Sequence, residues 1–258
     1  MTLIQCKKKD GVATLTLNRP DTLNSLNRDL FNQAISTLDE LAADTEARVV
    51  VLTGQGKAFC AGGDLDTILK LKDAADCHSF IGLAGRMAAR IYDFPKPVIA
   101  MVNGVAAGAG FNMVLACDVI FASSKARFAQ SFIGVGLHPD MGGTYLLPRA
   151  VGLHRAKELM FTGKMINAQE AHAMGFVNHV IPENELDEKV SEFANALAQR
   201  APLAIKLIKQ CCNRSFESGI DSMLATEVTN QVACWDSQDG KEGIRAFLEK
   251  RTPKYSGK

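Results

Sequence analysis

The sequence predicts an α/β protein, because segments with the two-residue period of strands alternate with segments that have the period of helices. Residues 12–17 (VATLTL) alternate and end at the turn-forming NRPD of residues 18–21. Within residues 24–42, apolar side chains recur three and four positions apart, which indicates one apolar stripe along a helix. The apolar run at 48–53 (RVVVLT) then predicts a buried strand. This order of strand, helix and strand is that of an α/β unit.

A second unit of the same kind follows. Residues 96–102 (KPVIAMV) predict a strand that leads through glycines into a helix at 111–116. The elements expected after it are, in chain order, a strand at 119–122, a short strand at 127–130, a glycine- and proline-rich loop at 134–143, and helices at 154–162 and 168–174. No low-complexity linker divides this part of the chain.

From Leu186 onward the pattern is almost wholly helical. One apolar stripe begins at Leu186 and another at Leu203. Two regions are therefore expected, a core at 1–200 that holds the functional site and a helical C-terminal region at 201–258.

The last helix has recognisable ends. Asp239 is followed three residues later by Glu242, which is the pattern of a capping box with Asp in the Ser/Thr role. The helix should begin there and end before Pro253. Its apolar face needs a partner, and we expect another subunit to supply it.

Composition excludes several functional classes. The chain has 258 residues and is 47% hydrophobic, which is enough for a large core. Its 29 Lys and Arg balance 28 Asp and Glu, so the net charge of +1 gives no field that would attract nucleic acid or anionic lipid. The seven cysteines are scattered without a C-x-x-C pair, which is typical of reduced thiols. With no targeting segment and no apolar run of membrane-spanning length, a cytoplasmic protein is expected.

Three well-known signatures are missing. The glycines do not form G-x-G-x-x-G, the sequence GQGK at 54–57 lacks Walker spacing, and no G-x-S-x-G occurs. A Rossmann dehydrogenase, a P-loop NTPase and an α/β-hydrolase are therefore disfavoured. The five histidines show no H-E-x-x-H spacing, so no metal site is expected.

Two glycine-rich segments follow buried strands, at residues 58–65 (AFCAGGDL) and 103–110 (NGVAAGAG). Backbone with so few side chains can point its N–H groups into a cleft, and two converging N–H groups would form an oxyanion hole. The spacing alone equally fits tight turns and close packing of a helix on a sheet.

These segments also carry a resemblance. FCAGGDL, KPVIAMVNGVAAGAG, CDVIFAS, GGTYLLPRAVG and the terminal EGIRAFLEKR resemble, in order and spacing, the enoyl-CoA hydratase/isomerase (crotonase) superfamily over nearly the whole chain. The resemblance implies a spiral of β-β-α units with a helical C-terminal trimerisation region. It also implies acyl-CoA substrates, no cofactor besides the CoA thioester itself, and a homotrimer or a hexamer built as a dimer of trimers.

The resemblance assigns roles to particular residues. The oxyanion donors would be the backbone N–H groups of Gly63 and Ala109, which would hold an enolate of the thioester. Hydratases of the family use two glutamates, and this chain has Asn112 and Phe132 at those positions. Neither side chain is an acid or base at neutral pH, which makes hydration by the two-glutamate route doubtful.

One carboxylate remains, at Asp140 in GLHPDMGGT. Isomerases of the family carry their catalytic carboxylate in the matching stretch, and the phrase looks most similar to ring-epoxide isomerases of phenylacetate degradation. Asp140 would move a proton from the α- to the γ-carbon of a 3-enoyl thioester, and Phe132 would keep the pocket dry and raise the pKa of Asp140. Asp140 as a turn residue after Pro139 is the alternative, and His138 could tune it.

The resemblance also suggests where CoA binds. The adenine would lie against the backbone around Ala61, Asp64 and Leu65, with Leu23 near the pantetheine. Lys57 could pair with phosphate, and Phe247 and Lys250 could reach the CoA of a neighbouring subunit.

Other functions stay open. One is an enoyl-CoA hydratase, and another is a non-catalytic CoA-binding or scaffold protein, suggested by the loss of both glutamates. An Asp140 nucleophile acting on an aryl-CoA would need a further histidine that is not evident. Some superfamily members bind RNA, but the balanced charge argues against this here. The acyl group that is processed cannot be inferred, although residues 67–86, with a weak helical pattern, are expected to line its pocket.

Overall fold

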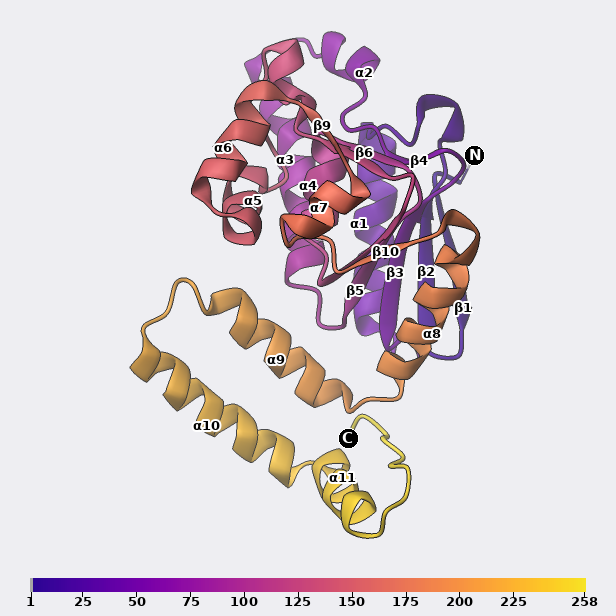
Figure 1. Cartoon of the computed structure of the whole chain (residues 1–258), viewed down its shortest axis with the longest axis vertical. Coiled ribbons are helices and arrows are strands. Elements are labelled where there is room, and N and C mark those ends of the chain that lie inside the picture. Colours follow the sequence, from indigo (N-terminus) through magenta and orange to yellow (C-terminus); the bar gives the residue numbers. More distant parts are fainter. Residues whose placement is uncertain (1) are drawn as a thin grey trace.

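The computed structural model describes residues 2–258 (Figure 1). Its strands are β1 (Ile4–Lys9), β2 (Val12–Leu17), β3 (Val49–Gly54), β4 (Ala58–Cys60), β5 (Val98–Val102), β6 (Val105–Ala107), β7 (Val119–Ser123), β8 (Arg127–Ala129), β9 (Met165–Asn167) and β10 (His179–Ile181). Its α-helices are α1 (Arg28–Ala43), α2 (Leu65–Leu69), α3 (Ala74–Tyr92), α4 (Ala109–Leu115), α5 (Gly143–Val151), α6 (Leu153–Thr162), α7 (Ala168–Ala173), α8 (Leu186–Ala198), α9 (Pro202–Arg214), α10 (Ile220–Asp236) and α11 (Gln238–Leu248). Short 3-10 helices are η1 (Pro20–Thr22), η2 (Ser131–Val135) and η3 (Glu183–Glu185).

The strands form two sheets joined by a spiral path of the chain. The larger sheet has six strands in the order β1-β2-β3-β5-β7-β10, and the smaller has four in the order β4-β6-β8-β9. Each turn of the spiral adds a strand to the larger sheet, then one to the smaller, and returns through helices: β3 and β4 precede α2 and α3, and β5 and β6 precede α4. Most pairings are parallel, and the exceptions are β1 with β2 and β8 with β9. The predicted α/β class and its repeated units are confirmed.

The central strands are buried on both faces, as the apolar run at 48–53 predicts. All residues of β3 and β5 are buried. One face of the larger sheet packs under α8, whose Leu186, Val190 and Ala194 belong to one hydrophobic cluster with Val49 and Phe121. Full burial of each large apolar side chain contributes about 1.5–3 kcal/mol to the stability of the fold. The packing of α8 on the larger sheet therefore holds the ends of its strands in fixed positions.

Helix α1 begins four residues later than its apolar period predicts. Asn24 has a left-handed backbone, with φ of 59°, and its buried side chain donates hydrogen bonds to the carbonyls of Gln55 and Ala58 at 3.0 and 2.8 Å. Asn27 caps the helix by accepting from Leu30 N at 2.9 Å. The segment before α1 is therefore a connection to β4 and not the first turn of a helix.

The cap predicted for the last helix is wrong. Ser237 caps α11 by accepting from Gly240 N at 2.9 Å. Asp239 is instead buried and accepts from the backbone N–H groups of Ser256 and Gly257 at 2.7 and 2.8 Å, because the C-terminal tail folds back over the helix. The helix does end before Pro253, at Leu248.

The three C-terminal helices extend away from the sheets in Figure 1. Helix α9 is anchored to the core by an ion pair between Lys209 and Asp118 at 2.8 Å and by a hydrogen bond from Asn213 Nδ2 to Tyr92 O at 2.8 Å. Helix α10 buries none of its residues in the described chain. Whether residues 201–258 form a domain distinct from 1–200 stays a prediction. None of the described helices is long and apolar enough to cross a membrane.

Candidate active site

The two glycine-rich segments lie side by side because they leave neighbouring parallel strands. Strand β4 pairs with β6 and is followed by Gly62 and Gly63, while β6 is followed by Gly108 and Ala109. Gly62 has φ of 101°, and a Cβ built on it would lie 2.8 Å from Ala107 O and 3.5 Å from Ala109 N. Only glycine permits this approach of the two segments. The sheet pairing thus brings the candidate oxyanion donors, Gly63 and Ala109, to one place.

The N–H groups of Gly63 and Ala109 are free to bind a ligand. Within residues 2–258 neither group donates to another protein atom, whereas the adjacent Asp64 N donates to Leu26 O at 3.0 Å. Ala109 is the first residue of α4 and is buried, and Gly63 is half-buried. Two backbone donors with no protein acceptor are what an oxyanion hole requires.

Asp140 lies beside the elements that carry these donors. Its backbone carbonyl accepts a hydrogen bond from Asn112, which lies in α4 one turn after Ala109. Its carboxyl charge also raises the pKa of Cys60, the last residue of β4, although burial is the larger cause of that pKa of about 12. Asp140 therefore lies near both α4 and the end of β4.

The Asp140 carboxyl has one oxygen that is buried without a hydrogen-bond partner. Its Oδ1 atom is inaccessible to solvent and accepts no hydrogen bond from the described residues. Burial raises the pKa of Asp140 from its ordinary 3.8 to about 6, and the opposing effects of its own backbone N–H and of His138 are smaller. A carboxyl with this pKa is a serviceable general base near neutral pH.

Both ends of the Asn112 side chain are hydrogen-bonded to neighbouring groups. It is completely buried, its Nδ2 donates to Asp140 O at 2.8 Å, and its Oδ1 accepts from Gln130 Nε2 at 2.7 Å. A Cβ on Gly143 would lie 2.2 Å from Asn112 Nδ2, so the turn after Asp140 is packed directly onto this amide. The sequence analysis assigned Asn112 no function, and only the fold shows that it contacts the Asp140 segment.

Phe132 and His138 differ in burial. The Phe132 ring is buried, 3.7 Å from where a Cβ on Gly108 would lie. His138 is exposed, and its Nδ1 contacts Pro139 O at 2.7 Å. The pKa of Asp140 is shifted in the direction that the sequence analysis expects of a dry pocket, but the contribution of Phe132 to this shift stays a prediction.

Asp64 has the opposite environment from Asp140. Burial alone would raise its pKa, but hydrogen bonds from Thr67, Arg19 and Ser25 outweigh burial and lower the pKa to about 2. Arg19 Nη1 lies 2.8 Å from Asp64 Oδ2, and Thr67 N donates to Oδ1 at 2.9 Å as the cap of α2. Asp64 is therefore a fixed anion that holds the glycine loop. The sequence analysis did not identify Arg19 or Ser25, because they are 45 and 39 residues away.

Several residues expected to bind CoA are gathered beside this loop. Ala61 N donates to Leu23 O at 2.9 Å, so these two segments lie together. Leu23 and Leu65 are 44% and 52% exposed, which leaves their apolar side chains available to a ligand. Lys57 is exposed at the turn before β4. CoA binding by these residues stays a prediction.

Phe247 and Lys250 are not brought to this site within one chain. Phe247 is 83% exposed on α11, which lies at the opposite end of the molecule from α2 and β4 in Figure 1. Lys250 follows at the end of that helix. Their expected contact with the CoA of a neighbouring subunit stays a prediction.

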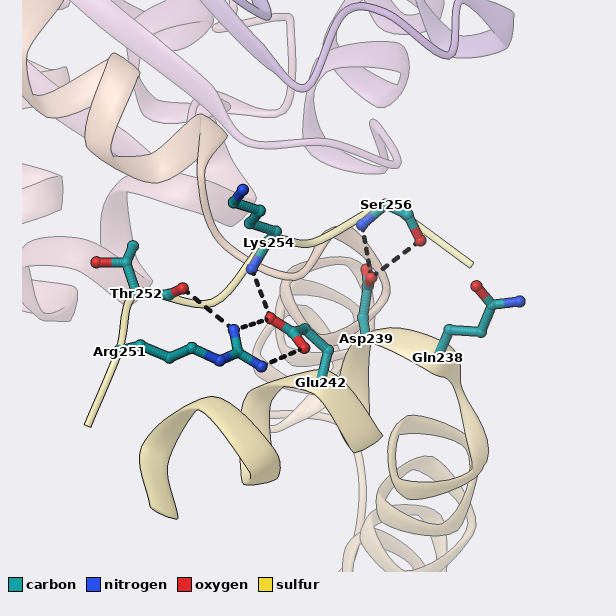
Figure 2. A pocket seen from close by; sticks show the side chains of 7 residues that line it. All are labelled: Gln238, Asp239, Glu242, Arg251, Thr252, Lys254 and Ser256. Carbon is teal, nitrogen blue, oxygen red and sulfur yellow. Dashed lines mark hydrogen bonds and ion pairs between the residues drawn. The ribbon is translucent and has the colours of Figure 1, made fainter. Parts of the chain in front are cut away.

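A hollow of about 740 Å³ near α11 is separate from the site at the glycine loops (Figure 2). Two of its charged groups are already paired: Arg251 donates to Glu242 through two nitrogens at 2.6 and 2.9 Å, and Lys254 N donates to Glu242 at 2.9 Å. The Arg251 hydrogen bonds lower the pKa of Glu242 to about 2. None of the predicted site residues lines it. No described His, Cys, Asp or Glu side chains gather in a group of three or more that could hold a metal ion.

Comparison with known proteins matches this geometry to one family. A family model described as enoyl-CoA hydratase/isomerase matches residues 7–258. The chain belongs to the enoyl-CoA hydratase/isomerase family. A crystal structure of enoyl-CoA hydratase from Bacillus anthracis superposes with a TM-score of 0.96 at 34% identity, covering 100% of both chains. The expected crotonase-type spiral is thus confirmed, and the chain is an enzyme of this family.

Relatives within the family are named for different reactions. A short-chain-enoyl-CoA hydratase of Clostridium acetobutylicum is 40% identical over 246 residues, covering 95% of this chain and 94% of that protein. A 1,2-epoxyphenylacetyl-CoA isomerase of Escherichia coli is 37% identical over 263 residues, covering 100% of both. The expected similarity to ring-epoxide isomerases is confirmed, but overall identity does not select the reaction.

Proposed function

We propose that this enzyme isomerises unsaturated acyl-CoA thioesters, moving the double bond of a 3-enoyl-CoA into conjugation with the carbonyl, with Asp140 as the only proton carrier. The observation that supports this most is the contrast between two carboxyls beside the glycine loops. The pKa of Asp64 is lowered to about 2 by its donors, whereas the pKa of Asp140 is raised to about 6 by burial. Environments that push two pKa values apart in this way separate a structural anion from an acid/base group.

The reaction balances with one carboxyl. The Asp140 carboxylate removes a proton from C2 of the 3-enoyl thioester, and the electron pair moves into the thioester carbonyl to give a dienolate. The N–H groups of Gly63 and Ala109 donate hydrogen bonds to its oxygen. The same carboxyl then returns the proton at C4, which forms the C2–C3 double bond and regenerates the carboxylate. No second acid, water or cofactor takes part.

Neither hydratase position supplies a competing acid or base. Asn112 is an amide with both ends engaged, and Phe132 is a buried ring. Water that entered would find one carboxyl, where the two-glutamate route needs two. The 37% identical ring-epoxide isomerase relative makes an acyl group that carries a ring a second candidate substrate class.

Product analysis tests the proposal. Purified enzyme is incubated separately with a 3-enoyl-CoA and a 2-enoyl-CoA, and isomers are separated from 3-hydroxyacyl-CoA by chromatography. We expect 2-enoyl-CoA from the first and no hydroxyacyl product from either. Asp140→Asn should lose turnover while keeping acyl-CoA affinity.

Hydration is the competing function, favoured by the 40% identical hydratase relative. Rapid formation of 3-hydroxyacyl-CoA would establish it and refute the single-carboxylate argument. Acyl-CoA binding with no turnover of chain or ring substrates would indicate a non-catalytic CoA-binding protein.

The CoA moiety would lie along the glycine loop, with adenine against Ala61, Asp64 and Leu65, pantetheine near Leu23, and phosphate near Lys57. We further propose a homotrimer or a hexamer in which Phe247 and Lys250 reach a neighbour's CoA. The exposed apolar side chains on α10 support an assembled state, and these are Ile220, Leu224, Val228, Val232 and Trp235. Sedimentation velocity on the purified protein tests this assembly, and a monomer at micromolar concentration would refute it.

A further inference from the structure

A chain of two buried amides ends at the backbone of Asp140. Gln130 is 1% exposed and donates from Nε2 to Asn112 Oδ1 at 2.7 Å. Asn112 is 0% exposed and donates from Nδ2 to Asp140 O at 2.8 Å. These two side chains connect α4 and the residue that follows β8 to the loop that carries the carboxyl.

We propose that Asn112 is a positioning residue for Asp140, and that Gln130 orients the Asn112 amide so that its N–H side faces the Asp140 carbonyl. Asn112 fixes the main chain from which the carboxyl projects and touches no substrate atom. The inference rests on the proposed function, because it gives Asp140 the proton transfer.

The Asp140 carboxyl has little else to hold it. Its Oδ1 accepts no hydrogen bond from the described residues, and the hydrogen bond that lowers the pKa of the carboxyl comes from its own backbone N–H, so the direction of the side chain depends on the backbone that bears it. That backbone is about to turn: Met141 and Gly142 have φ of 48° and 74°, and α5 begins at Gly143. Gly143 N also donates to Asp140 O, at 2.9 Å. The Asp140 carbonyl therefore has two donors, and only that of Asn112 reaches it from outside the loop.

Amide chemistry is required at position 112. One end of the side chain must donate to a carbonyl while the other accepts from an amide, and asparagine does both. An aspartate of the same shape keeps the acceptor for Gln130 but, when ionised, presents an oxygen to the Asp140 carbonyl. Two buried acceptors facing each other repel, so the loop would shift. A longer side chain does not fit, because Gly143 already packs against Nδ2.

The test is Asn112→Asp, assayed for conversion of 3-enoyl-CoA over pH 5 to 9. At pH 8 we expect kcat to fall about 100-fold with KM little changed, which is the effect of displacing a catalytic group by about 1 Å. The pH profile should also change shape. The wild-type rate should rise as Asp140 ionises and then stay level, whereas the variant should give a bell, because the new carboxyl donates to the Asp140 carbonyl only while it is protonated.

Other groups that face Asp140 do not produce this bell. They are Cys60 from β4, whose thiol has a pKa raised to about 12, and His138 from the same loop. Both are present in the wild type and the variant. A purely structural role for Asn112 would lower the melting temperature and leave the shape of the pH profile unchanged.

Asn213→Asp is the matched control. Asn213 Nδ2 also donates to a main-chain carbonyl, that of Tyr92, at the same 2.8 Å, but lies on α9. It should keep kcat within about twofold and a level profile, because the hydrogen bonds of Asn213 are to Tyr92 and not to the Asp140 loop. If Asn112→Asp does not fold, Gln130→Met is used, which removes only the donor to Asn112 and should lower kcat about tenfold without loss of acyl-CoA affinity.

The outcomes separate the two proposals. If Asn112→Asp, or Gln130→Met in its place, keeps the wild-type kcat and a level pH profile while Asp140→Asn is inactive, the positioning role is overturned and the proposed function stands. If Asp140→Asn stays active, the proposed function is overturned, and the positioning role with it.

Discussion

Replacing Asp140 by asparagine should abolish isomerisation and at the same time make the protein more stable at pH 8. The folded protein raises the pKa of this carboxyl from 3.8 to about 6. Since one pKa unit corresponds to about 1.4 kcal/mol, the ionised carboxylate costs the folded state up to about 3 kcal/mol. The asparagine side chain has the same shape and no charge, so it avoids that cost.

The sign and the pH window follow from the raised pKa. The folded state binds the proton more tightly than the unfolded chain, so ionisation above pH 6 destabilises the folded state in full. As the pH falls from 6 to 3.8 the wild type takes up its proton, and the advantage of the variant should shrink toward zero. Urea unfolding of both proteins at one fixed concentration, at pH 8, 7, 6, 5 and 4.5, measures the difference.

Asp64→Asn should change the free energy of unfolding in the opposite direction. Hydrogen-bond donors lower the pKa of Asp64 to about 2, so the ionised carboxylate stabilises the folded state, and the asparagine variant should be less stable than wild type at neutral pH. An Asp140→Asn variant that is no more stable than wild type at pH 8, or an advantage that does not decrease with acid, would show that burial does not perturb this carboxyl.

The remaining predictions concern pH, water and the glycine contact. The kcat/KM of the wild type for 3-enoyl-CoA should rise about tenfold between pH 5 and pH 7 as Asp140 loses its proton, and a flat profile would contradict a base of pKa about 6. Phe132→Glu should admit water, so that 2-enoyl-CoA yields some hydroxyacyl product and isomerisation slows; unchanged isomerisation without hydration would make Phe132 a lining residue only. Gly62→Ala should lower the stability by about 1–3 kcal/mol and remove most activity, because its Cβ would lie 2.8 Å from Ala107 O. A wild-type kcat in this variant would argue against an oxyanion hole formed by the two loops.

Those parts of the fold that depend on local pattern could be predicted from the sequence. The buried strand at 48–53 corresponds to β3, and the alternating segment at 12–17 corresponds to β2, because period and burial are properties of neighbouring residues. The short strands β4, β6 and β9 have three residues each, too few to show a period. The resemblance, more than the periodicity, indicated that both glycine segments belong to one site.

What could not be predicted depends on contacts between distant residues. Asp239 has the sequence of a helix cap, but the C-terminal tail returns to it and its carboxylate accepts from Ser256 and Gly257 instead. Asn112 is three residues from Ala109 in the sequence, yet its side chain donates to Asp140 O, 28 residues away. Neither partner can be inferred from spacing, because each depends on how separate turns of the spiral come together.

The separation in the sequence between the proposed oxyanion donors and the proposed proton-transfer residue has a consequence for engineering this enzyme. The amides that would hold the thioester follow β4 and β6, whereas Phe132 and Asp140 both lie in the single stretch between β8 and α5. The residues proposed to bind the thioester oxygen and those proposed to transfer the proton are thus encoded in separate segments of the gene. A library confined to codons 131–141 would vary the proton-transfer residues and leave the proposed oxyanion hole unchanged. The same fold could then be selected for different reactions.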